Sequence, residues 1–180
     1  MKKSFIILVV TLVIGPLLTS AKAAEDVLLV DQQYVIQQSK AGKYLLKQNE
    51  DLQKDLIDQV EIFRKDIEAK DKKIEEDKTL LSPEVYQERK IALQEEANAK
   101  QKEIQARGQK IQEATQNASA TIQSVMRPIL EALVNDKGAK LLLDKQVVVT
   151  SDPKLDISAE VIKKLNKRLL AEDVKLNISE

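Results

Sequence analysis

The feature that most constrains this chain is a glycine-poor stretch from about Lys43 to Val134, in which apolar residues recur with helical spacing. The spacings are three, four and seven, and almost every other position is charged, Gln, Asn or Ala. One turn signal, Ser82-Pro83, divides the stretch, because Ser is a favourable N-cap and Pro suits the first helical position. The pattern predicts a long antiparallel coiled-coil hairpin arm with little interior and a large surface.

The two limbs of this arm should meet along an apolar seam. Gly108 in the second limb is either a tolerated surface glycine or a flexible point, since glycine in a helix costs about 1 kcal/mol relative to alanine. Pro128 lacks an N–H and clashes with the preceding turn, so we expect the arm to bend there as it enters a compact base. The seam of the first limb runs through Leu45, Leu52, Leu56, Phe63, Ile67, Ile74 and Leu81.

Short apolar runs on both sides of the arm predict the base. Val27–Val30 is typical of a strand covered on both faces, and Leu141–Leu143 and Val147–Val149 are typical of a β-hairpin. A base this small would be only marginally stable by itself, and we therefore expect several subunits to share it. The predicted class is α+β, mostly α, with the arm inserted in a β-strand base. The expected divisions are a leader at 1–23, a base strand and lead-in at 24–42, the arm at 43–134, a base β-hairpin and helix at 135–172, and an unpartnered tail at 173–180.

The composition excludes most kinds of chemistry. The 180 residues include no His, Cys or Trp, and only 3% of them are aromatic. The commonest metal ligands and nucleophile–base pairs are therefore missing, and aromatic residues are too few for a cofactor pocket or a base-stacking platform. The 29 basic and 29 acidic residues cancel, so no field that attracts nucleic acid is evident. We expect no catalytic residue, no metal and no cofactor.

One short motif, Ala41-Gly42-Lys43, looks like the end of a phosphate-binding loop. Gln37 stands where that loop needs its first glycine, and Tyr44 stands where it needs Ser or Thr. The match fails at both positions, so we expect no nucleotide site.

The first 23 residues have the layout of a cleaved export signal. Lys2 and Lys3 precede an apolar core, and Ala21-Lys22-Ala23 matches an A-x-A cleavage site. The alternative is a transmembrane anchor, but the apolar run is shorter than the roughly 20 residues that span a bilayer. We expect cleavage after Ala23. Removing three lysines from the 29 basic residues would leave 26 against 29 acidic ones, a mildly acidic mature chain.

Four sequence blocks occur in the order found in a known family. They are Val27-Leu28-Leu29-Val30-Asp31, Leu80-Leu81-Ser82-Pro83-Glu84, Ile129-Leu130-Glu131-Ala132 and Asp156-Ile157-Ser158. On these blocks the chain resembles the OmpH-like family over nearly its whole mature length. The resemblance implies a jellyfish-like homotrimer in the periplasm, whose arms enclose a cavity for unfolded outer-membrane proteins. It does not carry over a basic surface for lipopolysaccharide, because no matching Lys/Arg cluster is found here.

Three functions compete, and the first is an ATP-independent holdase chaperone, which fits long arms without a nucleotide motif. The alternative is a periplasmic structural spacer or scaffold, which would need a membrane or wall anchor that the mature sequence lacks. An enzyme is disfavoured, because the Asp/Glu/Lys pairs of the arm are explained as helix-surface pairs. The expected partners are unfolded outer-membrane proteins and further copies of the chain, with no nucleic acid. The expected contacts between subunits are Val27, Leu29, Leu141, Leu143, Val147 and Val149.

Overall fold

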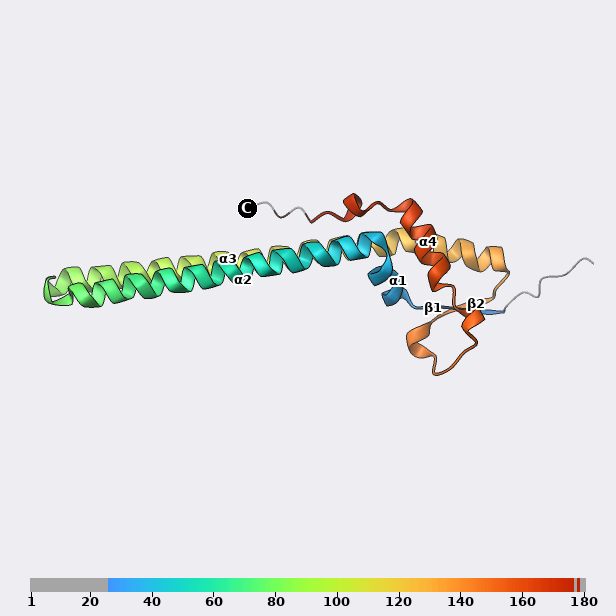
Figure 1. Ribbon diagram of the computed structural model, residues 1–180, viewed down its shortest axis with the longest axis horizontal. Coiled ribbons are helices and arrows are strands. Elements are labelled where there is room, and N and C mark those ends of the chain that lie inside the picture. Colours follow the sequence, from blue (N-terminus) through green and yellow to red (C-terminus); the bar gives the residue numbers. More distant parts are fainter. Residues whose placement is uncertain (1–25, 177, 179–180) are drawn as a thin grey trace, which may run out of the picture.

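The molecule is a long helical hairpin with a small base at one end (Figure 1). It is a computed structural model that describes residues 26–176 and 178, so the expected leader and its cleavage site lie outside the described residues. Its helices and strands are β1 (Val27–Val30), α1 (Gln32–Gln38), α2 (Lys40–Glu76), α3 (Pro83–Lys137), β2 (Leu141–Asp144) and α4 (Ser158–Arg168). Short 3-10 helices lie at Asp77–Thr79, Lys145–Val147, Pro153–Leu155 and Ala171–Val174.

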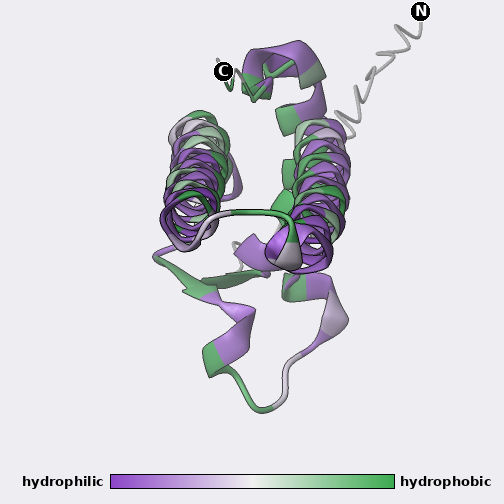
Figure 2. Cartoon of the chain, turned by 90° about the vertical axis from the view of Figure 1, so that its left-hand side faces the viewer, coloured by the Kyte–Doolittle hydropathy of each residue, from purple (hydrophilic) through white to green (hydrophobic). Residues whose placement is uncertain are grey.

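The predicted hairpin arm is confirmed, with α2 and α3 as its antiparallel limbs. The 37 residues of α2 span about 55 Å at 1.5 Å per residue. The turn is capped as expected, since the Ser82 hydroxyl accepts a hydrogen bond of 3.3 Å from the Val85 backbone N–H. Viewed from the tip, both limbs are mostly hydrophilic and the turn between them is partly hydrophobic (Figure 2). Leu80 in that turn is 83% exposed.

The second limb passes both expected bend positions as one uninterrupted helix. α3 continues beyond Pro128 to Lys137, so the arm and the base share a helix where the sequence predicted a division. Ile129 and Leu133 are fully buried just after the proline, and their packing in the base holds this segment helical. Gly108 is half-buried, and a Cβ built there would lie 3.7 Å from the Leu56 side chain on the facing limb.

The junction between α1 and α2 explains why glycine occurs in Ala41-Gly42-Lys43, the motif that looks like the end of a phosphate-binding loop. The buried Ser39 hydroxyl donates to the Ile36 carbonyl at 2.8 Å and accepts from the Gly42 N–H at 3.0 Å. A Cβ on Gly42 would lie 1.7 Å from the Ile36 carbonyl oxygen. Only glycine allows the two helices to approach this closely, so the motif is structural.

The base forms around β1, which joins segments far apart in the sequence. β1 pairs in parallel with β2, with Val27 opposite Leu141 and Val30 opposite Asp144. On the strand's other side, the Ile157 N–H donates to the Leu29 carbonyl at 2.9 Å. The core beneath packs α1, the root of α2, the end of α3 and α4 together. Its fully buried members include Leu28, Val35, Ile122, Met126, Ile129, Leu133, Val161 and Leu165.

The predicted β-hairpin in the base is wrong. Leu141–Leu143 does lie in a strand, but Lys145–Val147 is a 3-10 helix and residues 147–149 form no strand. Val147 is 75% exposed and Val149 is fully exposed, so no neighbouring strand covers them. The parallel partner of β2 comes instead from the other end of the described chain.

The prediction of an unpartnered tail is also wrong. Val174 and Leu176 are buried, and Ile178 packs against the same core. The Gln48 side chain of α2 bonds to the tail backbone on both sides: its Nε2 donates to the Val174 carbonyl at 3.3 Å, and its Oε1 accepts from the Leu176 N–H at 3.0 Å. The tail therefore lies along the root of the arm.

Candidate functional site: a groove along the arm

The described residues carry no sign of a metal centre. Across residues 26–176 and 178, no group of three His, Cys, Asp or Glu side chains is placed to hold a metal ion. Within the same residues, none of the helices combines the length and apolar character needed to cross a bilayer. The candidate site is instead a surface, built where the two limbs of the arm face each other.

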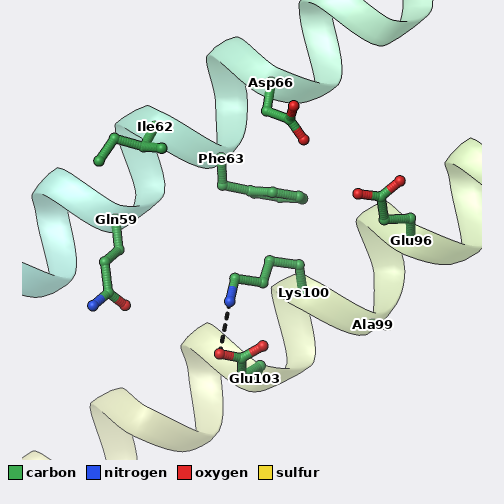
Figure 3. Close-up of a pocket in the computed structure, with 8 residues that line it drawn as sticks. All are labelled: Gln59, Ile62, Phe63, Asp66, Glu96, Ala99, Lys100 and Glu103. Atoms are coloured by element: carbon green, nitrogen blue, oxygen red, sulfur yellow. Dashed lines mark hydrogen bonds and ion pairs between the residues drawn. The ribbon is translucent and has the colours of Figure 1, made fainter.

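A groove of about 640 Å³ lies between α2 and α3 in the middle of the arm (Figure 3). Ile62 and Phe63 of α2 and Ala99 of α3 supply its apolar part. The Phe63 ring extends from α2 toward α3, where Lys100 lies opposite (Figure 3). Ile62 is 68% exposed, so much of its apolar surface is open to solvent in the groove. The polar lining is Gln59, Asp66, Glu96, Lys100 and Glu103.

The groove continues in both directions along the same side of the arm. Toward the base, a hollow of about 440 Å³ shares Gln59, Lys100 and Glu103 with it and ends at Ile178 of the tail. Toward the tip, a hollow of about 320 Å³ shares Glu96. The three hollows together form what we call the arm groove. They are lined, besides the residues above, by Leu52, Ala106, Arg107, Lys110, Lys70, Lys73, Ile74, Arg89, Ala92 and Leu93.

Ion pairs tie the limbs together beside the groove. Lys70 bonds to Glu96 of the facing limb at 2.5 Å and to Asp66 of its own at 2.7 Å. The hydrogen bonds that Lys70 donates to Asp66 and to Glu96 raise the pKa of Lys70. Arg107 bonds to Asp55 at 2.6 Å across the limbs. Because these pairs are partly exposed to solvent, the ties hold the limbs in register more than they stabilise the fold.

A second polar cluster lies near the tip. The Tyr86 hydroxyl donates to Glu75 at 2.7 Å, and Lys90 bonds to Glu75 at 3.2 Å and to Asp71 at 2.5 Å. The hydrogen bond from Tyr86, followed by that from Lys90, lowers the pKa of Glu75. For Glu75, Tyr86 and Lys90, hydrogen bonds within this cluster explain the shifted pKa. The perturbed pKa values of this cluster are therefore explained by a surface network of hydrogen bonds and ion pairs.

Comparison with known proteins identifies the family that has this fold. The family model of OmpH-like outer membrane proteins matches residues 26–165, which include β1, the whole arm and most of α4. The chain belongs to the OmpH-like family. A crystal structure from Caulobacter crescentus, of a protein described as a candidate OmpH-like outer membrane chaperone, has the same fold. Its TM-score is 0.74 at 19% identity, covering 80% of this chain and 85% of that one. Among curated proteins, none matches this chain.

In this OmpH-like chain the expected subunit contacts lie in three environments: buried, half-buried and exposed. Leu29 is 2% exposed and already buried by its own chain. Leu141, Val147 and Val149 are exposed apolar residues of the base. Val27 and Leu143 are half-buried. The exposed set is therefore available for contact with another subunit, whereas Leu29 belongs to the interior of one.

Sequence reasoning missed the arm groove and the tail contact in this OmpH-like chain. The seam residues were identified, but Ile62 and Ala99 lie beside the seam, where the heptad pattern does not select them. The tail carried a usable signal: Val174, Leu176 and Ile178 alternate with polar residues, the spacing of an extended segment with one buried side.

Proposed function

We propose that this OmpH-like protein is a periplasmic, ATP-independent holdase chaperone. It binds unfolded outer-membrane β-barrel proteins against its coiled-coil arms and prevents their aggregation during transit. The observation that carries the proposal is the arm groove, where apolar side chains such as Ile62 stay exposed between charged rims. Many weak contacts of this kind suit a client that must be held and then released without a fuel.

Assembly as a homotrimer is part of the proposal. The exposed apolar residues of the base, Val147 and Val149 among them, support a surface that another copy of the chain covers. Joined bases would hold several arms around a common space. A client chain would then contact several arm grooves at once, which raises the overall affinity without any strong single contact.

A matched shortening of the arm tests the function. The cross-limb contacts Lys70–Glu96 and Leu56–Gly108 place residue i opposite about residue 164 minus i, so deleting 60–73 with 91–104 preserves the pairing. Two heptads per limb shorten the arm by about 20 Å and remove the middle of the arm groove. We expect the base to fold and to assemble as before, because no base strand lies in the deletion.

The readout is the aggregation of an unfolded β-barrel protein diluted from denaturant, followed by light scattering. The shortened protein should suppress aggregation poorly, while Glu50→Lys, a single charge reversal on the exposed arm surface, should suppress it as well as the unmodified protein does. Equal suppression by the shortened and full-length proteins would remove the arms as the holding surface and favour a structural spacer.

A further inference from the structure

The C-terminal segment lies against the root of the arm and presents buried apolar residues to it. After the 3-10 turn at Ala171–Val174 the backbone is extended, with φ −63° and ψ 129° at Lys175. Val174 and Leu176 point into the core at the root of the arm, and Lys175 between them is exposed. Alternate side chains of an extended segment point to opposite sides, so one apolar side of the tail faces the arm.

The arm holds this segment partly through its backbone. The Gln48 amide donates to the Val174 carbonyl and accepts from the Leu176 N–H, at 3.3 Å and 3.0 Å. Bonds to backbone groups of residues i and i+2 do not depend on the side chains between them. The contact therefore requires an extended backbone and apolar residues at every second position, but no particular sequence.

The surface that holds the tail continues past the tail. Ile178 lines the hollow nearest the base, and that hollow shares Gln59 with the middle of the arm groove. Beyond Ile178 the groove again offers apolar residues, Ile62 and Ala99, along the same side of the arm. The rims carry both signs of charge, for example Asp66 and Lys100, and so favour neither acidic nor basic occupants.

We propose that the arm groove binds extended polypeptide with apolar residues at alternate positions, and that Val174, Leu176 and Ile178 are its built-in occupant at the root. This deepens the proposed function, on which it rests, by stating what part of a client is recognised. Strands of membrane β-barrels carry this alternation, with apolar residues facing the lipid at every second position. The tail would then compete with a client for the end of the groove nearest the base.

Site-specific photo-crosslinking of the full chain tests the groove. A photoreactive residue replaces Ala99 in the groove, and a matched one replaces Gln101, which is also exposed on α3 but points about 200° away around the helix. The probes are two ten-residue peptides of one composition, with apolar residues either alternating or in one block. We expect position 99 to label the alternating peptide several-fold more than the block peptide, with little labelling at 101. Equal labelling of both peptides, or equal labelling from both positions, would overturn the proposal.

Release of the tail tests the built-in occupant. Gln48→Ala removes both bonds to the tail backbone, while Gln53→Ala changes an exposed glutamine of the same helix. We expect Gln48→Ala to speed hydrogen exchange at the Leu176 amide and to raise labelling of the alternating peptide several-fold at position 106, near Ile178. Faster exchange without a gain in labelling would show that the tail does not occupy the client's place. Unchanged exchange would show that Gln48 does not hold the tail, and would overturn this part of the proposal as well.

The aggregation assay, run on the same preparations, separates this proposal from the function on which it rests. Suppression of aggregation without selective labelling at position 99 would leave the holdase and reject the groove as its contact. Selective labelling without suppression would leave the groove as a peptide site and reject the holdase.

Discussion

The arm and the base differ in how many of their apolar residues are buried. Among residues 46–117, all of them described, only Ile74, Leu93 and Ile111 are buried apolar residues, and none of them joins the main core. The base and the root of the arm form one cluster of sixteen buried residues from both ends of the described chain. The arm is therefore nearly all surface, whereas the base and the root of the arm contain the hydrophobic core.

This difference indicates that the base provides most of the stability of the fold, while the surface of the arm can change without loss of that stability. Local opening is easiest where few apolar contacts are buried, so the free energy of opening should fall from the base toward the tip. Polar ties such as Lys70–Glu96 keep the limbs in register but are exposed to water and salt. The arm can vary in surface without unfolding the base, which suits a contact surface for many clients.

The largest effect we predict separates the two kinds of apolar residue in the base. Leu29→Asp places an unpaired charge at a site that its own chain buries, at a cost of several kcal/mol, and should unfold the base. Val149→Asp puts the charge on a fully exposed residue, so the subunit should stay folded and lose the homotrimeric assembly proposed above. Circular dichroism with sedimentation velocity distinguishes these outcomes. A Val149→Asp protein that assembles as before would remove this valine from the subunit contact.

The next prediction compares one substitution in the two regions. Ile129→Ala empties a fully buried site of the base and should lower the free energy of unfolding by about 2–5 kcal/mol. Ile67→Ala alters a half-buried seam position of the arm and should cost about 1 kcal/mol, because less apolar surface returns to water. Denaturant unfolding at one fixed protein concentration measures both. Equal losses would mean that the arm and the base unfold as one unit with similar packing.

Substitution of one glycine in the base and one in the arm extends this comparison to the backbone. Gly42→Ala places a Cβ against the Ile36 carbonyl in the base and should destabilise the fold by about 1–3 kcal/mol. Gly108→Ala meets only the Leu56 side chain at an ordinary distance, and should stabilise the arm by up to about 1 kcal/mol.

Thermal unfolding followed by circular dichroism measures the effect of both glycine substitutions. Suppression of client aggregation, the activity proposed above, provides a second measurement. If Gly108→Ala stabilises the arm but weakens client protection, the glycine serves as a flexible point. If both properties hold or improve, it is a tolerated glycine of the limb interface.

The parts that could be predicted from sequence are those governed by local pattern. The heptad seam and the cap at Ser82 depend on residues within a few turns of each other, and both are present. The runs Leu141–Leu143 and Val147–Val149 look alike as strings, yet only the first finds a partner. Strand pairing here is parallel and joins residues 114 positions apart, as in Val27 and Leu141, and no local pattern encodes it.

The candidate site was harder to predict than the fold, for a related reason. Gly42 is needed because another helix approaches it, which its own neighbours in sequence do not reveal. The arm groove depends on Ile62 and Ala99 meeting across two limbs, beside the seam that defines the coiled coil. The residues that line a groove between two helices depend on which sides of those helices face each other. These sides can be identified only once the register of the two limbs is known.

The smallest effect we predict lies at the tip of the arm, where the surface network is farthest from the base. The pKa of Glu75 is held below its ordinary value of 4.5 by the Tyr86 hydroxyl and then by Lys90. A lowered carboxyl pKa contributes stability above pH 4.5, and the contribution is lost as the pH falls through the pKa of the folded state. Tyr86→Phe should let the pKa of Glu75 rise toward 4.5, as NMR titration of its carboxyl carbon would measure. Tyr34→Phe, an exposed tyrosine of α1, is the matched control.

Global unfolding should hardly respond to Tyr86→Phe, because Glu75 is exposed to solvent and the limbs near it bury little apolar surface. The two measurements together locate the boundary between the regions. A shifted Glu75 titration with unchanged unfolding means that the network at the tip contributes little to the stability of the base. If Tyr86→Phe instead lowers the free energy of unfolding as much as Ile67→Ala does, the tip is coupled to the base along the whole arm. The arm would then act as a rigid strut, and its surface could not adapt to clients by local opening.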